Sequence, residues 1–523
     1  MIVENGDGME KKVKKHRVKS KLSGLSRAIM VGLSFLLQIA LMFVMVYYMQ
    51  FHAIWLYFVI EVVSIILIFA LVNDSESYKK FWIIIVLALP VVGFLLYFMW
   101  GRKRTNSKGY RLFREVDGKM MESLKTDAAA LERLREVHPN KVQISRYLAR
   151  EGYPLYENTE VSYYKIGEEM REALFEDIRN AKSYIFMEYF IISDGVFWGE
   201  LYELLKQKVK EGVEVRLLLD DFGCIFINTK EFRADLKANG ITYAEFAPIH
   251  KDVARLSFNY RNHQKITIID GNIGYTGGIN IADEYVNEIV RFGHWKDTAV
   301  RLEGEGVFSL TCFFLEMWEI AEGTGSLDYE LYKPTVRLDV PGIVQPFADG
   351  PANNPKNTAE GTYTHMINKA RDYIYITTPY LVLDQRMVDD LCRAAASGVD
   401  VRIITPKIYD KWYVYMVTVS NYGELIKKGV HIYEYQPGFI HAKNVVVDDE
   451  VALCGTINMD YRSFYLHYEC AVLMSRNHAV TDIKQDFLDT LGVCKEISYA
   501  DWIHRPLRHK FIQAVLRIFS PLL

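Results

Sequence analysis

The sequence lacks the patterns that mark several common classes of protein. Its six cysteines lie far apart without a C-x-x-C pair, which argues against a zinc site or a disulfide framework. No G-x-x-x-x-G-K-[ST] loop occurs, so the chain has no standard site for nucleotide phosphates. The net charge is only -3 over 523 residues, so the composition offers no basic field that would attract nucleic acid. We therefore expect free thiols, no metal, no cofactor and no nucleic-acid partner.

Charge is also nearly absent from three long runs near the start of the chain. Residues 28–49 and 81–100 contain no charged residue, and residues 54–72 contain only Glu61. About 20 apolar residues span a bilayer as a helix, so each run is a candidate transmembrane helix in a membrane region at 28–100. A cleaved signal peptide fits poorly, because the first run is too long and lacks a small-residue cleavage site.

The basic segments on either side of this region restrict its topology. Residues 1–27 are rich in lysine and arginine, and residues 101–114 contain six basic residues and no acid. Both segments favour the cytoplasmic side, which two spans or a re-entrant segment allow but three full spans do not. The run at 54–72 is the weakest candidate, since Glu61 would be costly in lipid. We expect a multi-pass protein of the cell membrane with the chain after residue 100 in the cytoplasm.

After a basic, mostly helical connector at 101–155, the sequence repeats itself. AKSYIFMEYFIISD (181–194) matches ARDYIYITTPYLVLD (370–384), and EGVEVRLLLD (211–220) matches SGVDVRIITP (397–406). Apolar β-branched runs alternate with amphipathic stretches, a pattern typical of a parallel or mixed α/β sheet. A proline-rich segment at 334–355 separates the two copies. The sequence therefore predicts two α/β domains, at 156–340 and 341–523.

One further pattern, His-x-Lys-x4-Asp-x6-Gly-[Gly/Thr]-x-Asn, occurs once in each copy. Its residues are His263, Lys265, Asp270, Gly277, Gly278 and Asn280 in the first copy, and His441, Lys443, Asp448, Gly455, Thr456 and Asn458 in the second. The His-x-Lys-x4-Asp part alone arises by accident in roughly one chain of this length in twenty. Two copies with the same extension are therefore not accidental.

The residues of this motif suit transfer of a phosphoryl group. Histidine has a pKa near neutrality, so one imidazole can attack phosphorus while its protonated twin donates to the leaving group. The lysine ammonium groups and the Asn280 and Asn458 amides can hold the non-bridging oxygens. Runs typical of buried strands (266–270 and 444–448) follow each lysine, and each glycine pair allows a close backbone approach. Asp270 and Asp448 end these strands, which favours a structural role in the turns.

A carboxylate that orients each histidine is also expected. Asp297 in GHWKD and Glu469 in LHYE follow the two motifs at similar places, although each could be an ordinary surface carboxylate. His294 and His467, which lie close to these acids, are more typical of packing or hydrogen-bonding histidines.

Both motifs resemble those of the phospholipase D superfamily, whose members carry two copies on a pseudo-twofold pair of α/β sandwich domains. NHQKITIIDGNIGYTGGINIADEY and GFIHAKNVVVDDEVALCGTINMDYRSFYLHYE, with a hydrophobic run ending in LPVVGFLLYFMWGR, are similar to bacterial cardiolipin synthases. The run at 28–49 departs from that family, which usually has two N-terminal spans. The resemblance implies catalytic roles for His263, Lys265, Asp270, His441, Lys443 and Asp448, without a metal or a cofactor.

The reaction implied by this resemblance is a transphosphatidylation, in which two phosphatidylglycerols become cardiolipin and glycerol. His263 would form a phosphatidyl-histidine, and His441 would act first as acid and then as base, although the symmetry of the motifs does not decide which histidine attacks. A hydrolytic phospholipase D would share these residues, and a membrane-tethered phosphodiesterase or nuclease is a further alternative. A non-enzymatic scaffold is disfavoured, because both motifs are intact.

The C-terminal segment HRPLRHKFIQAVLRIFSPLL contains basic residues among apolar ones and no acid. This pattern favours an interfacial helix on anionic lipid over an ordinary packed terminal helix. We therefore expect phosphatidylglycerol and other anionic membrane lipids as partners.

Overall fold

The computed structural model describes residues 76–88, 97, 108–125, 128–248, 260–352 and 356–522, with a few single helical positions between 59 and 69. The expected membrane run at 28–49 lies outside these residues, as do most positions of the runs at 54–72 and 81–100. Within the described part of the chain, no helix is both long and apolar enough to cross a membrane.

The first half of the chain forms a seven-stranded mixed sheet. Its strands, in spatial order, are β1 (Thr159–Tyr164), β8 (Ala299–Gly304), β7 (Ile273–Gly277), β6 (Lys265–Ile269), β2 (Tyr184–Tyr189), β3 (Glu214–Asp220) and β4 (Thr242–Phe246). β2, β3 and β4 are parallel, while β6, β7 and β8 run antiparallel to their neighbours. The helices that follow the first strands are α8 (Gly167–Asn180), α9 (Val196–Lys210) and α10 (Lys230–Ala238).

The second half repeats this topology. β10 (Tyr373–Thr377), β12 (Asp400–Pro406) and β13 (His431–Tyr435) are parallel, and β14 (Asn444–Val447), β15 (Val451–Gly455) and β17 (His467–Ser475) follow antiparallel, as β6, β7 and β8 do in the first half. The helices before, between and after them are α13 (Thr358–Lys369), α14 (Gln385–Ala396), α15 (Trp412–Lys427) and α17 (His478–Leu491). β9 (Ile343–Asp349) pairs with β17 as β1 pairs with β8, and β18 (Cys494–Glu496) extends the edge. The expected α/β fold with two repeated units is therefore present.

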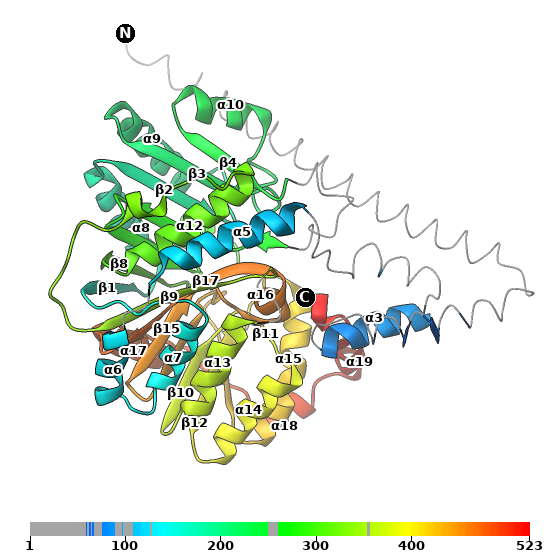
Figure 1. The fold of residues 1–523 in the computed structure, drawn as a ribbon. Helices are drawn as coiled ribbons and strands as arrows, with labels where there is room; N and C mark the ends of the chain where they lie inside the picture. Colours follow the sequence, from blue (N-terminus) through cyan, green and yellow to red (C-terminus); the bar gives the residue numbers. More distant parts are fainter. Residues whose placement is uncertain are drawn as a thin grey trace, which may run out of the picture.

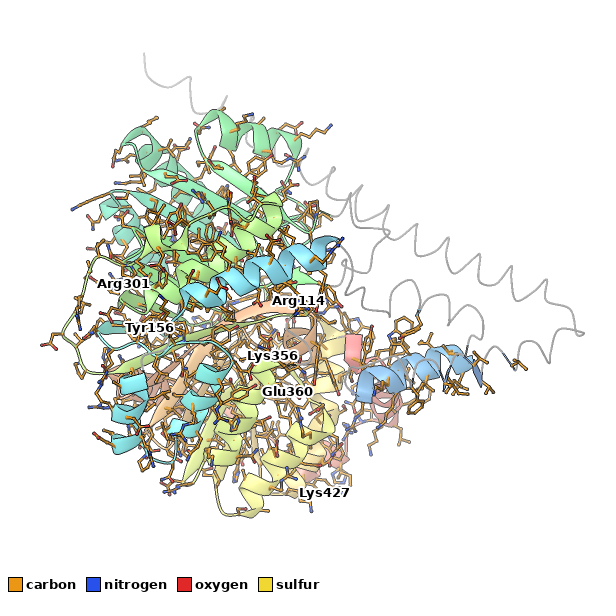
Figure 2. The ribbon with its side chains drawn as sticks, viewed as in Figure 1. Arg114, Tyr156, Arg301, Lys356, Glu360 and Lys427 are labelled. Atoms are coloured by element: carbon orange, nitrogen blue, oxygen red, sulfur yellow. The ribbon has the colours of Figure 1, made fainter. Side chains whose placement is uncertain are left out.

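The two halves are joined through their backbone as well as their side chains. The short strand β5 (Arg261–Asn262) belongs to the first half by sequence but pairs with β17 of the second. Tyr156, labelled in Figure 2, pairs through its backbone with Val344, and its hydroxyl lies 2.9 Å from Ser309 Oγ in α12 (Val307–Glu322). Figure 1 shows β9 and β17 crossing the middle of the molecule, between the two groups of strands.

The connector contributes three helices that contact both halves: α5 (Lys108–Ser123), α6 (Ala128–Val137) and α7 (Val142–Arg150). α5 packs along α12, whereas α7 packs on α13 and β9 (Figure 1). On another side of the molecule, α3 (Glu76–Ala88) lies near the C-terminal helix α19 (Leu507–Ile518) and η6 (Ser520–Leu522) (Figure 1).

Candidate active site

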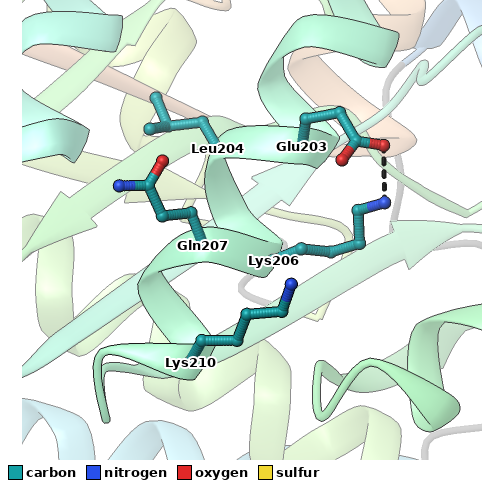
Figure 3. Close-up of a pocket in the computed structure, with 5 residues that line it drawn as sticks. All are labelled: Glu203, Leu204, Lys206, Gln207 and Lys210. Atoms are coloured by element: carbon teal, nitrogen blue, oxygen red, sulfur yellow. Dashed lines mark hydrogen bonds and ion pairs between the residues drawn. The ribbon is translucent and has the colours of Figure 1, made fainter.

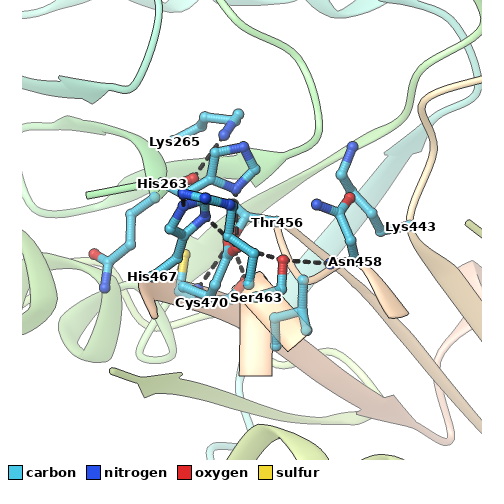
Figure 4. A network of polar contacts seen from close by, with 12 residues as sticks. His263, Lys265, Lys443, Thr456, Asn458, Ser463, His467 and Cys470 are labelled. Carbon is cyan, nitrogen blue, oxygen red and sulfur yellow. Dashed lines mark hydrogen bonds and ion pairs between the residues drawn. The ribbon is translucent and has the colours of Figure 1, made fainter. Parts of the chain in front are cut away.

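Both motifs contribute side chains to one buried cluster between the halves. His263 lies between β5 and β6, Lys265 begins β6, and His441 and Lys443 lie just before β14. All four side chains are buried, and the charges of Lys443 and His441 act on His263. Figure 4 shows Lys443 and Asn458 of the second motif beside His263 and Lys265 of the first. The structure therefore brings together the two motifs.

Each motif histidine contacts a carboxylate from the other half. His263 Nδ1 lies 2.9 Å from both carboxylate oxygens of Glu469, and His441 Nδ1 lies 2.6 Å from Asp297 Oδ2. The backbone explains this exchange, because His263 N donates to Tyr468 O at 2.9 Å. In the same way, His441 N donates to Lys296 O at 2.7 Å. Glu469 directly follows Tyr468, and Asp297 directly follows Lys296. Each backbone bond therefore places an acid beside the histidine of the other half.

The two carboxylates are held by different groups. Glu469 accepts hydrogen bonds from Thr456 Oγ1 and from Ser463 Oγ, the latter at 2.7 Å. Asp297 Oδ1 accepts from the Thr298 backbone N–H at 2.9 Å. A Cβ at Gly278 would lie only 2.0 Å from Asp297 Oδ1, so glycine is required there, whereas the equivalent Thr456 supplies a donor. The motifs therefore differ at this position because Gly278 leaves room for Asp297, whereas Thr456 donates a hydrogen bond to Glu469.

The glycines at the ends of β7 and β15 allow close backbone contact. A Cβ at Gly277 would lie 2.4 Å from Thr298 O, and one at Gly455 would lie 2.5 Å from Ala471 Cα. Real Cβ atoms do not approach other atoms so closely. Glycine at both positions therefore keeps the strands that carry the acids against the motif turns.

Burial shifts the pKa of most of the titratable groups in the site. It lowers the pKa of His263 well below the usual value, with Lys265 adding to the effect, and lowers that of His441 to about 4 against the opposing charge of Asp297. Burial also lowers the pKa of Lys265 to about 7 and that of Lys443 to about 8. It raises the pKa of Glu469 to about 8. A bound phosphodiester anion would favour the charged lysines and a protonated histidine, so the site is suited to an anionic ligand.

The lysines and Asn280 retain hydrogen-bonding capacity for such a ligand. Lys265 Nζ donates to His263 O at 2.6 Å, and Lys443 Nζ donates to His441 O. An ammonium group has three donors, so each lysine can make further bonds. Asn280 Oδ1 accepts from the Ile191 N–H at 3.0 Å, while its amide nitrogen is buried without a hydrogen-bond partner within the described residues.

Asp270 and Asp448 lie away from the histidines, at the far ends of their strands. From Lys265 to Asp270 the chain runs five residues along β6, or roughly 16 Å. Asp270 accepts from the backbone N–H groups of residues 182–184, and Asp448 from those of 371–373. Both carboxylates are therefore engaged in fixing a turn, and the catalytic role that the resemblance implies for the two aspartates stays a prediction.

His467 and Ser463 also lie in the cluster, although sequence reasoning did not assign either to the site. The His467 ring centroid lies 5.2 Å from that of His263, while His294 Nδ1 lies 3.0 Å from Tyr435 Oη. His467 is two residues before Glu469 on β17, and side chains two apart on a strand point to the same face. The sequence could therefore have indicated that His467 lies beside Glu469. Ser463 has no counterpart in the first motif that could have identified it.

His263, His467 and Glu469 bring ligand atoms within 4.8 Å of one another, a spacing compatible with a metal ion. However, burial lowers the pKa of His467, and the nearby positive charges of Arg462 and Lys265 lower it further. Positive charge beside a site opposes the binding of a cation, so the cluster favours an anion instead.

A pocket lies on the surface of α9 (Figure 3). It is lined by Glu203, Leu204, Lys206, Gln207 and Lys210, all from one helix, and Lys206 pairs with Glu203. It contains none of the motif residues, and we assign no chemistry to it.

Comparison with known families and proteins agrees with this geometry. The model of the family described as "Cardiolipin synthase, PLD-like domain" matches residues 174–290 and 363–491, and that of "Phospholipase_D-nuclease N-terminal" matches 53–102. Cardiolipin synthase 2 of Staphylococcus epidermidis is 33% identical over 451 residues, which cover 84% of this chain and 92% of that protein. Cardiolipin synthase of Geobacillus kaustophilus is 33% identical over 467 residues, covering 88% and 92%.

Among solved structures, phosphatidylserine synthase from Haemophilus influenzae is similar in fold. The match covers 73% of this chain and all of that protein, with a TM-score of 0.58 and 14% sequence identity. At this identity the likeness concerns the fold alone. The family model and the sequence relatives show that the chain belongs to the family of cardiolipin synthases with phospholipase D-like domains.

Proposed function

We propose that this protein is a phosphatidyltransferase that converts two molecules of phosphatidylglycerol into cardiolipin and glycerol. The observation that carries the proposal is the buried site in which two histidine–carboxylate pairs meet, one from each motif. Membership in the cardiolipin synthase family supports the substrate class, since a synthase of this lipid acts on phospholipids.

In the first step, His263 attacks the phosphorus of one phosphatidylglycerol. Its Nδ1 contacts Glu469, which leaves Nε2 as the nucleophilic atom. A bond forms between Nε2 and phosphorus, while the bond from phosphorus to the glycerol headgroup breaks. His441, paired with Asp297, gives a proton to the departing glycerol oxygen.

In the second step, the headgroup hydroxyl of another phosphatidylglycerol replaces the histidine. His441 now takes the proton of that hydroxyl. The hydroxyl oxygen bonds to phosphorus, and the phosphorus–nitrogen bond to His263 breaks. One phosphodiester replaces another, so the exchange needs no nucleotide energy. Lys265, Lys443, Asn280 and Asn458 hold the non-bridging oxygens, where negative charge increases in the transition state.

The proposal includes an anchored, multi-pass protein of the bacterial cell membrane whose catalytic halves lie on the cytoplasmic side. The uncharged runs at 28–49, 54–72 and 81–100 and the basic segments that flank them support this arrangement. The match of residues 53–102 to an N-terminal family model also supports it. Anchoring would keep the acceptor lipid at high local concentration, which favours transfer over hydrolysis.

Product analysis tests the proposal. The purified full-length protein is incubated with phosphatidylglycerol in mixed micelles, and cardiolipin, glycerol and phosphatidic acid are quantified. We expect cardiolipin and glycerol in equal amounts, and neither from the His263→Ala or His441→Ala variant. Phosphatidic acid without cardiolipin would instead mean that water is the acceptor and that the protein is a hydrolase.

A further inference from the structure

Exposed aromatic side chains follow equivalent strands of the two halves. In the first half, the segment after β3 carries Phe222 and Phe226, which are 45% and 54% exposed. In the second half, the segment after β12 carries Tyr409 and Trp412, which are 42% and 52% exposed. Large apolar groups exposed in matching places mark an interaction surface rather than scattered surface residues.

The first of these segments, residues 221–228, lies beside His263. Asp220, at the end of β3, accepts a hydrogen bond at 3.0 Å from the backbone of Asn262, the residue before the histidine. The guanidinium of Arg261 lies 5.3 Å from the Phe222 ring. A Cβ at Gly223 would lie 1.9 Å from Phe190 O, and the Phe190 ring centroid is 5.0 Å from that of His263.

The second segment, residues 407–412, lies near His441. The Tyr380 hydroxyl donates to Asp410 at 2.6 Å, and the Lys411 ammonium lies 5.0 Å from the Tyr380 ring. The Tyr380 ring contacts Phe439 at 6.5 Å between centroids, and Phe439 contacts His441 at 5.7 Å. One exposed aromatic segment thus adjoins each histidine.

Helix α19 extends this apolar surface. It packs on α15, which begins at Trp412, and buries Gln513. Its outer face carries Leu507 and Phe511, 80% and 71% exposed, followed one and two turns later by Val515 and Ile518. Beyond the helix, the Phe519 ring lies 5.8 Å from Phe81 of α3, so the apolar surface reaches α3.

The charge of α19 indicates which partner this face fits. The helix contains Arg508, Lys510 and Arg517 and no acid, so its apolar stripe is flanked by positive charge only. A helix with an apolar face and basic flanks suits the interface of an anionic bilayer, where rings and aliphatic groups enter the headgroup region and cations meet lipid phosphates. A protein partner would require a complementary apolar and acidic face, whereas anionic lipid is already the class of substrate.

We propose that residues 221–228, residues 407–412 and the outer face of α19 form one bilayer-contacting surface beside the active site. This inference rests on the proposed function and extends it. The segment beside His263 contacts the leaflet where the donor lipid enters, and the segment beside His441 contacts it where the acceptor enters. Both lipids can then present their headgroups to the buried pairs while their acyl chains remain in the membrane.

Two forms of substrate test this surface with the full-length protein. Glycerol release is measured with phosphatidylglycerol vesicles and with dihexanoyl phosphatidylglycerol below its critical micelle concentration. We expect the variants Phe226→Ser, Trp412→Ser and Phe511→Ser to lose about tenfold or more in kcat/KM on vesicles, because each removes a large apolar group from the interface. Their activity on the monomeric lipid is expected to stay within about twofold of the unchanged protein.

Leu331→Ser is the matched control. Leu331 is 77% exposed in η5 (Tyr329–Tyr332), and its neighbour Tyr332 packs on Tyr184 at the start of β2, the end of the sheet opposite to Asp220. This variant is expected to retain both activities. Equal losses on both substrates, no loss on vesicles, or the same loss in Leu331→Ser would each overturn the proposed surface.

A fluorescence measurement tests the surface without relying on activity, in case a serine variant folds poorly. Bimane attached at Phe226→Cys is expected to be quenched by brominated lipids in proteoliposomes, and bimane at Leu331→Cys is not. Absence of quenching at position 226 would overturn the surface even if activity falls. Glycerol release reports hydrolysis as well as transfer, so phosphatidic acid as the product would contradict the synthase function without affecting this test.

Discussion

At the scale of single residues, each motif histidine depends on a carboxylate from the opposite half of the chain. The arrangement makes the two pairs interdependent, since the backbone contact that aligns a histidine also aligns its acid. It also makes the pairs unequal, because Glu469 is held by two hydroxyl groups and Asp297 by a backbone N–H. This inequality suits two histidines that act in different steps.

Because Glu469 contacts His263 and Asp297 contacts His441, we expect variants of the two acids to affect different steps of the reaction. With a phosphatidyl ester of p-nitrophenol, the leaving group needs no proton, so attack by His263 alone sets the initial burst. Glu469→Gln is expected to slow this burst by about 10²–10⁴-fold, because it removes the group that orients His263. Asp297→Asn is expected to preserve the burst and slow turnover, because it acts on His441. Rapid-quench kinetics of both variants check this.

The opposite pattern, with the burst lost in Asp297→Asn and preserved in Glu469→Gln, would contradict the assignment of His263 as nucleophile. Circular dichroism of both variants serves as the control for folding.

The lysines predict a dependence on pH. As pH rises through the lowered pKa values of Lys265 and Lys443, about 7 and about 8, each ammonium loses the charge that holds the phosphodiester. The substrate remains an anion throughout, so kcat/KM is expected to fall on the alkaline side from about pH 7 to 8, well below the ordinary lysine value near 10.4. Measurement of kcat/KM between pH 6 and 10 checks this.

The variant Lys443→Arg distinguishes the titration of Lys443 from that of Glu469, whose pKa is also about 8. A guanidinium stays charged across this range, so the variant is expected to lose the part of the alkaline decline near pH 8 even if its activity is lower. An unchanged decline in the variant, or a flat profile in the original protein, would count against the role of the lysines.

At the scale of elements, the strand-turn units that carry the motifs could be predicted from local sequence. The runs ending at Asp270 and Asp448 form β6 and β14 as expected, and the aspartates accept hydrogen bonds in the turns. Local patterns could not predict which histidine each acid contacts. That depends on β5 pairing with β17 and on the bridge between Lys296 and Ile440, and these segments are far apart in the sequence.

The two equivalent turns differ in one contact, which predicts a difference in stability. Asp448 also pairs with the buried Lys141 ammonium, at 2.5 Å, whereas the bonds to Asp270 among the described residues come from backbone N–H groups. Burial would raise the pKa of Asp448, but bonds from Lys141 and the backbone outweigh it and lower the pKa. Asp448→Asn leaves the buried Lys141 without this partner, so we expect it to lower the free energy of unfolding by about 1–3 kcal/mol more than Asp270→Asn. Denaturant unfolding of both variants provides the comparison.

Equal destabilisation by the two substitutions would mean that the ion pair between Lys141 and Asp448 does not stabilise the fold. Lys141→Met provides a check from the other side of the pair and is expected to be less destabilising than Asp448→Asn, because it removes the buried ammonium and leaves Asp448 with its three backbone hydrogen bonds.

At the scale of the whole molecule, the internal repeat was the part of the architecture most accessible from sequence. Matching runs at 181–194 and 370–384 contain β2 and β10, and the strands after them follow the same order in both halves. The sharing of β5 across the halves was not accessible, because a two-residue strand leaves no periodic signal. The division into domains at 340/341 and the topology of the membrane region remain predictions.

The central claim is that one site, built by both halves, carries a phosphatidyl group on histidine. The most direct measurement is to quench the protein in denaturant at alkaline pH during turnover of phosphorus-labelled phosphatidylglycerol, and to map the labelled residue. Phosphohistidine is stable to alkali and lost in acid, so the bond can be identified as well as located. The account predicts label on His263, still formed in His441→Ala with the p-nitrophenyl ester and absent from His263→Ala. Label on His441, or cardiolipin synthesis by a His263→Ala variant, would contradict it.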